Sequence, residues 1–188
     1  MASDFKQDCW QVLSRTSLLH KPPWLEVYQE VIRLPNDQVV LDYYNVTMPH
    51  YTGVFAVTPD EKVLVLECYR HAVGEVTLTV PGGMLEPGED PLIGVQRELL
   101  EETGYKATVW TSIGSFVGNA TRGCGTYHFF YAQNAHLIQP PNSGDLEELN
   151  LLLWTPSQVE QSIYRGRVKS VGVLALFLWG LQWLKQIT

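Results

Sequence analysis

One helix in the middle of the chain, set among segments typical of strands, constrains the fold most. Asp90 can cap its start, Pro91 suits the first helical position, where no amide hydrogen is needed, and Gly104 can end it in the left-handed conformation. We therefore predict a helix over residues 91–103. A single helix embedded among strands that short turns connect indicates a mixed β-sheet with helices on its faces.

Runs of β-branched and aromatic residues between turn-forming residues predict the strands of this sheet. The predicted strands are residues 25–34, 39–46, 51–58, 62–69, 76–80, 107–117, 126–135 and 149–154. Pro35, Asn36 and Asp37 join the first two strands, which are expected to form a hairpin. Helices are also predicted over residues 156–164 and 169–185. The fold class is thus α/β, a mixed sheet with an N-terminal β-hairpin extension.

Length and charge restrict the class of protein. A chain of 188 residues lies within the range of one domain, and we expect residues 1–188 to form one. The net charge of −7 repels a polyphosphate backbone. The balance of charge therefore argues against binding to nucleic acid and favours the recruitment of cations.

The cysteines and the apolar segments bear on location. Cys9, Cys68 and Cys124 lie far apart without metal-ligand spacing, which is typical of reduced thiols in the cytoplasm. Residues 1–10 contain no apolar core of a signal peptide. The apolar segment 171–181 is shorter than the roughly 20 residues of a membrane span. We expect a cytoplasmic protein that does not enter a membrane.

Three glutamates on the predicted helix carry the clearest chemical signal. Glu98, Glu101 and Glu102 are spaced i, i+3 and i+4, so their carboxylates converge on one helix face. Like charges at this spacing destabilise a helix, and anions near its C-terminus oppose the helix dipole. A hard divalent cation such as Mg²⁺, which prefers oxygen ligands, would offset that cost. The alternative is an acidic face that contacts only solvent.

The segment before the helix suits close approach to a ligand. Residues 81–89 end a strand in a turn-forming stretch, and the backbone of Gly82 and Gly83 can come near a ligand because neither residue has a side chain. Arg97 could hold a neighbouring carboxylate, such as that of Glu89, by a bidentate ion pair that fixes the metal ligands in place. An ordinary surface arginine is the alternative.

Together these residues match a known motif, the Nudix box GX5EX7REUXEEXGU, over residues 83–105 with the spacing of the family. The matching positions are Gly83, Glu89, Arg97, Glu98, Leu99, Glu101, Glu102, Gly104 and Tyr105. The sequence therefore resembles a Nudix hydrolase. The resemblance implies an α/β/α sandwich in which the box forms a loop, a helix and a second loop.

The resemblance also implies a reaction. Mg²⁺ or Mn²⁺ ions would hold the pyrophosphate of a small nucleotide, with Glu98, Glu101 and Glu102 as metal ligands and the Gly82 carbonyl as an addition. The ions would neutralise phosphate charge and lower the pKa of a bound water, which attacks phosphorus in line. Arg97 would act beside these catalytic glutamates. Such an enzyme hydrolyses the pyrophosphate bond of a nucleoside diphosphate joined to another group.

A looser resemblance, through residues 66–70 and 74–83, is to the ADP-ribose and ADP-sugar pyrophosphatase branch of the family. It implies that Arg70 contacts the substrate and that an acidic loop after the box supplies a base or a further metal ligand, with Glu147 as the candidate. An exposed strand arginine and a solvated turn are the alternatives. It also implies a homodimer in which the strands of residues 1–46 take part.

Departures from the branch leave the exact substrate open. Thr79 stands where the branch usually has glutamate, and a glycine-rich loop over residues 118–125 replaces an expected proline. Asn119 and Arg122 of this loop, together with Gly83, are candidates for substrate binding. The alternatives are a nucleoside triphosphate, a dinucleoside polyphosphate or NADH as substrate, or a Nudix-like domain that binds a nucleotide as a sensor without catalysis.

Overall fold

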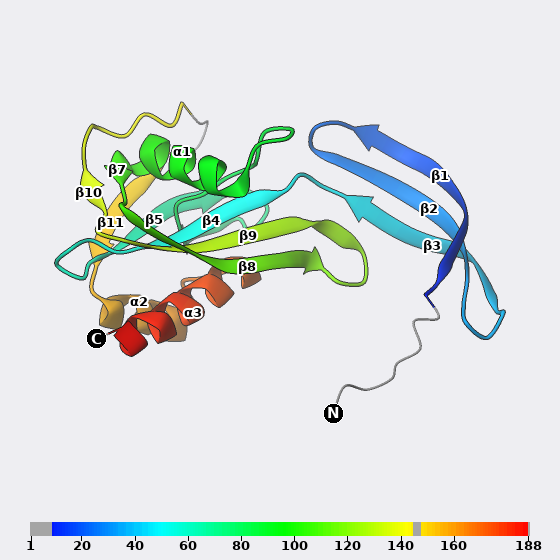
Figure 1. Cartoon of the computed structure of the whole chain (residues 1–188). Coiled ribbons are helices and arrows are strands. Elements are labelled where there is room, and N and C mark those ends of the chain that lie inside the picture. The colour runs from blue at the N-terminus through cyan, green and yellow to red at the C-terminus, as the bar shows by residue number, and fades with distance from the viewer. Residues whose placement is uncertain (1–8, 145–147, 188) are drawn as a thin grey trace. The chain divides into compact units, whose positions relative to one another are not determined.

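The computed structural model describes residues 9–144 and 148–187, which form two compact units. Within that part of the chain, unit 1 consists of residues 9–49 and Val117–Gly125. Unit 2 consists of His50–Phe116 with residues 126–144 and 148–187. Figure 1 labels most of the elements of both units. That residues 1–188 form one domain stays a prediction.

Unit 1 is built on three antiparallel strands, β1 (Gln11–Lys21), β2 (Leu25–Arg33) and β3 (Val39–Thr47). The predicted hairpin corresponds to β2 and β3, but the sequence analysis missed β1. Two shifts of register, between Val12 and Ser14 and between Ser17 and Leu19, interrupt its pairing with β2. All of its residues are exposed. The two-residue alternation that identifies a half-buried strand is therefore missing.

A buried carboxylate connects the three strands of unit 1. Glu30 of β2 is 2% exposed. Arg15 Nε of β1 donates to Glu30 Oε1 at 2.6 Å, and Asn45 Nδ2 of β3 donates to Oε2 at 2.5 Å. A buried charge without such partners is very unfavourable. The observed alignment of the strands gives both oxygens a partner, so this network stabilises their register.

Unit 2 contains a mixed sheet in which β4 (Tyr51–Ala56) pairs in parallel with β9 (Gly123–Gln133), and β8 (Val109–Asn119) also pairs with β9. A second, antiparallel sheet has the order β11 (Asn150–Trp154), β5 (Val63–Arg70) and β6 (Glu75–Thr79). Two short strands, β7 (Tyr105–Lys106) and β10 (His136–Leu137), form a third pair. The prediction of an α/β class with a mixed sheet is confirmed.

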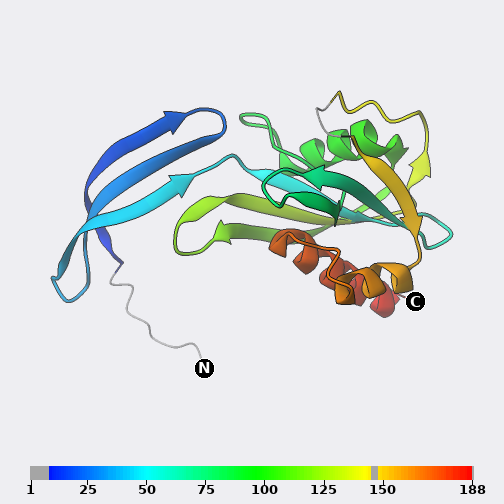
Figure 2. The ribbon, with the colours of Figure 1, turned by 180° about the vertical axis from the view of Figure 1, so that it is seen from behind.

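Helices cover both faces of these strands, as Figures 1 and 2 show for α1 on one side and for α2 and α3 on the other. Their bounds are α1 (Pro91–Thr103), α2 (Pro156–Tyr164) and α3 (Val171–Ile187). Alternate strand residues supply the two cores: Val54 and Ala56 pack in the cluster of α1, whereas Phe55 and Val57 pack in that of α3. The alternation follows from the two-residue period of a strand.

The bounds of α1 and α2 agree with the predicted helices, and α3 is displaced by two residues from its prediction. Although α3 is rich in apolar residues, no helix in the described part of the chain is long and apolar enough to cross a membrane. Its apolar residues instead include Leu176, Phe177 and Leu181, which are buried in the core below β4 and β9.

Two glycines of α3 provide a test of this packing. A Cβ at Gly180 would lie 2.2 Å from Cγ of the fully buried Phe55, whereas a Cβ at Gly172 would come no closer than 3.4 Å to Phe129. We predict that Gly180→Ala lowers the free energy of unfolding by about 1–3 kcal/mol through overpacking. Gly172→Ala should leave it unchanged or raise it by up to about 1 kcal/mol through helix propensity. Urea denaturation of both variants measures the two free energies of unfolding. An equal change in both variants would contradict the packing described.

Candidate active site

The helix α1 is held at both ends as the sequence predicts. The Asp90 side chain accepts hydrogen bonds from the backbone N–H groups of Leu92 at 2.9 Å and Ile93 at 3.3 Å. Gly104 has φ 75°, and its N–H donates to the Leu100 carbonyl at 2.8 Å. These caps satisfy backbone groups that a helix end leaves without partners. They define the face on which the glutamates stand.

Arg97 lies at the centre of the charged groups on that face. Its Nε and Nη2 donate to the two oxygens of Glu89 at 3.0 and 3.1 Å, which is the predicted bidentate pair. Its Nη1 donates to Glu98 Oε1 at 2.7 Å and to Glu101 Oε2 at 3.1 Å. The hydrogen bonds from Arg97 hold the pKa of the Glu89 carboxyl below its usual value, and the same pairing raises the pKa of Arg97. One guanidinium thus connects three carboxylates.

The two glycines before the helix lie close to the carboxylates of Glu102 and Glu98. The Gly82 N–H donates to Glu102 Oε2 at 2.7 Å, and Glu102 is 8% exposed. A Cβ on Gly83 would lie 2.7 Å from the carboxyl carbon of Glu98, so a larger residue would displace that carboxylate. A Cβ on Gly82, which has φ 148°, would lie 2.2 Å from the Thr52 carbonyl oxygen. Close approach explains why both positions need glycine.

Backbone hydrogen bonds attach this loop to strand β4. The N–H of Thr52 donates to the Gly83 carbonyl at 2.9 Å, and the N–H of Val54 donates to the Pro81 carbonyl at 3.0 Å. The Leu85 N–H in turn donates to the His50 carbonyl at 2.9 Å. The loop therefore has a rigid support between the sheet and α1, which is what a site for precise chemistry requires.

The donor atoms fit a hard divalent cation. Glu98 and Glu102 bring carboxylate oxygens to adjacent glycines, and Glu101 adds another from the same helix face. Oxygen donors of this kind suit Mg²⁺ or Mn²⁺. In residues 9–144 and 148–187, no three His, Cys, Asp or Glu side chains form a ready-made metal centre. Arg97 instead shares oxygens of Glu98 and Glu101, so the carboxylates are oriented by their own arginine.

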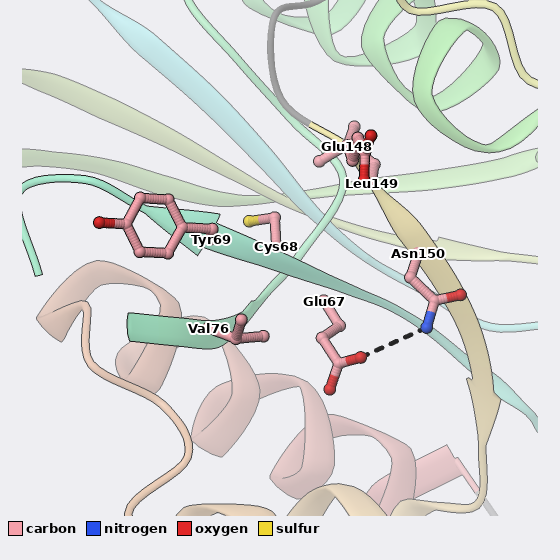
Figure 3. Close-up of a pocket in the computed structure, with 7 residues that line it drawn as sticks. All are labelled: Glu67, Cys68, Tyr69, Val76, Glu148, Leu149 and Asn150. Atoms are coloured by element: carbon pink, nitrogen blue, oxygen red, sulfur yellow. Dashed lines mark hydrogen bonds between the residues drawn. The ribbon is translucent and has the colours of Figure 1, made fainter. Parts of the chain in front are cut away.

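The predicted substrate residue Arg70 ends β5, a strand whose preceding residues line an open pocket of about 630 Å³. Figure 3 shows the lining residues, which are Glu67, Cys68, Tyr69, Val76, Glu148, Leu149 and Asn150. Asn150 Nδ2 donates to Glu67 Oε2 at 3.3 Å, and Arg167 forms an ion pair with the same carboxylate. Glu148 of the acidic loop lines this pocket, whereas the predicted base Glu147 lies outside the described residues.

The other two predicted substrate residues, Asn119 and Arg122, belong to unit 1. Asn119 Oδ1 accepts from the N–H groups of Thr121 at 3.0 Å and Arg122 at 2.9 Å, which shapes the turn between β8 and β9. Arg122 Nη1 donates to the Tyr44 carbonyl at 2.8 Å, and its guanidinium lies 5.2 Å from the centre of the Tyr43 ring. Both residues thus hold the turn against β3, and a role with substrate stays a prediction.

The sequence analysis missed one cluster of reactive side chains, formed by His50, Ser115 and His128 in unit 2. Ser115 Oγ lies 2.8 Å from His128 Nδ1, and His128 Nε2 lies 3.4 Å from His50 Nδ1. The two histidines are 78 positions apart in the chain. No spacing rule connects residues at that separation, and only the parallel pairing of β4 with β9 brings them together.

Comparison with known proteins agrees with this geometry. A mixed sheet lies between helices, and a helix that carries three glutamates follows a loop with two adjacent glycines. The NUDIX domain model matches residues 49–174. The chain belongs to the Nudix family, as predicted.

Two relatives and one solved structure are similar over long segments. The chain is 30% identical over 124 residues to an ADP-ribose pyrophosphatase of Bacillus subtilis, a match that covers 66% of each protein. It is 30% identical over 140 residues to a methanol dehydrogenase activator of Bacillus methanolicus, covering 73% of this chain and 74% of that protein. A crystal structure of an ADP compounds hydrolase has the same fold, with a TM-score of 0.82, 16% identity, and coverage of 94% of this chain and 95% of that one.

The family model and the relative in Bacillus subtilis place the chain among the pyrophosphohydrolases of the family, in the branch that contains ADP-ribose pyrophosphatases. The solved structure shows the fold. Nudix hydrolases generally use divalent metal ions, and they act on small nucleotide substrates. The predicted class of enzyme and the predicted α/β fold are confirmed at this level. The roles of individual residues are developed as proposals below.

The Arg97–Glu89 pair allows a test of how the site is held. We predict that Glu89→Gln lowers the free energy of unfolding by about 1–2 kcal/mol, because a charged bidentate hydrogen bond that is largely buried is lost. Glu86→Gln, on the same loop and exposed, is the matched control and should change the stability by less than about 0.5 kcal/mol. Equal denaturation midpoints for the two variants would show that the pair does not stabilise the site.

Proposed function

We propose that this protein hydrolyses the pyrophosphate bond of ADP-ribose or a nucleotide sugar with Mg²⁺ or Mn²⁺ as cofactor. One observation carries the proposal: the carboxylates of Glu98 and Glu102 meet the adjacent glycines Gly83 and Gly82. The arrangement offers oxygen donors beside a backbone that a substrate can approach closely. The relative in Bacillus subtilis, an ADP-ribose pyrophosphatase by name, supports this class of substrate.

Glu98, Glu101, Glu102 and the Gly82 carbonyl would hold the divalent ion. When bound, the ion would neutralise phosphate charge and lower the pKa of a coordinated water. Arg97 orients the carboxylates of Glu98 and Glu101 through its hydrogen bonds, while the Gly82 N–H orients that of Glu102. Because such side chains are held before the substrate arrives, little reorganisation is needed during the reaction.

Within unit 2, we propose that Arg70 and Gly83 bind the substrate, while Asn119 and Arg122 of unit 1 stay candidates from the sequence alone. The pocket lined by Glu67, Cys68 and Tyr69 of β5, about 630 Å³, has a volume within the usual range for sites that bind small molecules. Arg70 would supply positive charge to a substrate that carries two phosphates. Glu147, outside the described residues, is proposed as the base. These assignments rest on the family resemblance together with the position of β5.

The first test measures cleavage of ADP-ribose, ADP-glucose, GDP-mannose, NADH, diadenosine polyphosphates and nucleoside triphosphates with Mg²⁺ or Mn²⁺. We expect ADP-ribose or one nucleotide sugar to be the best substrate. Glu98→Gln and Glu102→Gln should each reduce kcat/KM by about 10²–10³-fold, because each removes charge that stabilises the transition state through the ion. Chelation of the divalent ion should abolish turnover of the wild type.

Glu86→Gln is the matched control for this assay, since it removes one carboxylate from the exposed part of the same loop. Its kcat/KM should equal that of the wild type. A protein that binds a nucleotide in calorimetry but cleaves none of the panel would be a sensor, and the proposed hydrolase function would be wrong. Preferred cleavage of a nucleoside triphosphate would instead support the proposed hydrolysis but show that the proposed class of substrate is wrong.

We further propose a homodimer in which residues 1–46 form the interface, and a cytoplasmic location. The three cysteines form no disulfide, which suits a reducing compartment. Unit 1 exposes many large apolar side chains, more than a small solvated sheet usually leaves uncovered. They are Trp10, Val12, Leu13, Leu18, Leu19, Trp24, Val39, Leu41 and Tyr44. A second copy of the chain would cover this apolar surface.

We predict that the wild type elutes as a dimer and that Leu41→Asp, at a residue 65% exposed, shifts it to a monomer. A charge placed in an apolar interface loses its hydration without gaining a partner. Tyr164→Asp, at an exposed aromatic residue of unit 2, is the control and should leave the mass unchanged. Light scattering coupled to size-exclusion chromatography gives the masses. A monomeric wild type at micromolar concentration would refute the dimer.

A further inference from the structure

Two histidines on neighbouring strands face each other apart from the box glutamates. His50 directly precedes β4, and His128 lies within its parallel neighbour β9. The rings stack with 5.6 Å between centroids and 29° between planes. His128 Nε2 lies 3.4 Å from His50 Nδ1, and Ser115 Oγ of β8 lies 2.8 Å from His128 Nδ1. Strand pairing therefore brings two nitrogen ligands to one point of unit 2.

The two ring nitrogens form a long hydrogen bond at 3.4 Å, and their separation is also that of two ligands on one metal ion. Hydrogen bonds from N–H groups usually measure roughly 2.7–3.2 Å between heavy atoms. Two imidazole nitrogens that each lie about 2.0–2.1 Å from a tetrahedral ion are about 3.3 Å apart. The observed 3.4 Å between His128 Nε2 and His50 Nδ1 is close to that separation.

Ser115 supplies the partner that a metal-binding histidine needs. When the Ser115 oxygen accepts the proton on His128 Nδ1, the Nε2 atom keeps its lone pair and faces His50. Metal-ligating histidines generally donate their other N–H to an oxygen in this way.

We propose that His50 and His128 form a binding site for a divalent transition-metal ion of the type that prefers imidazole, namely Zn²⁺, Ni²⁺ or Cu²⁺. Imidazole nitrogen suits these ions, whereas Mg²⁺ prefers carboxylate and water oxygens. The two histidines belong to no group of three or more potential ligands in the described part of the chain, so water completes the coordination. The net charge of −7 favours cations near the surface. The site is thus separate in ligands and in metal preference from the box glutamates.

The test uses the full chain with Cu²⁺ for spectroscopy and Zn²⁺ for affinity. Paramagnetic resonance of one equivalent of Cu²⁺ should show coupling to two imidazole nitrogens. In a competition with a chromophoric chelator, His50→Ala and His128→Ala should weaken Zn²⁺ binding by about 100-fold or more, and Ser115→Ala by about tenfold. His136→Ala, an exposed histidine on β10, is the matched control and should bind Zn²⁺ like the wild type.

Glu98→Gln separates this site from the box and should retain the two-nitrogen Cu²⁺ spectrum. Loss of that spectrum in Glu98→Gln, together with unchanged Zn²⁺ affinity in both histidine variants, would assign the ion to the glutamates and overturn the proposal. A wild-type spectrum without two imidazole nitrogens would overturn it as well. The wild-type spectrum requires no substitution, so it decides even if a histidine variant fails to fold.

Discussion

The bidentate ion pair between Arg97 and Glu89 is the interaction on which the candidate site depends. It joins the loop before α1 to the helix itself, at 3.0 and 3.1 Å. The remaining donor of the guanidinium reaches Glu98 and Glu101. Without that positive charge, carboxylates at neighbouring positions of one helix face would repel each other. The arginine therefore allows a high density of negative charge to exist in a folded protein before any cation binds.

Strand β4 supports the same loop from the opposite side. Its inward-facing residues alternate between the core under α1 and the core under α3, so its position is fixed by both. The N–H groups of Thr52 and Val54 donate to the carbonyls of Gly83 and Pro81, so the position of β4 fixes the position of the loop. The packing of β4 in two cores thus determines where the loop before α1 lies. The geometry of the site therefore depends on the geometry of the sheet.

Sequence patterns predicted the features that depend on nearby residues. The helix over residues 91–103, its caps and the pair of Arg97 with Glu89 follow from short spacings, and each is present. Strand β1 was missed because its irregular pairing with β2 removes the alternation of side chains. The contact of His50 with His128 was missed because it depends on the pairing of distant strands. The contacts of Arg122 with Tyr44 and Tyr43 were also not predicted, because they join residues far apart in the chain.

The partners of the box glutamates also bear on which cation they suit. Glu98 and Glu101 share the fixed positive charge of Arg97, which weakens their attraction for a second cation, whereas Glu102 accepts from a neutral backbone N–H. A cation held mainly by these shared carboxylates gains less binding free energy from the protein than a cation surrounded by carboxylates alone. Mg²⁺ tolerates this, because it keeps several waters and takes further oxygens from substrate phosphates. The proposed site at His50 and His128 offers imidazole nitrogens instead of carboxylate oxygens, so the two groups of ligands would prefer different metals.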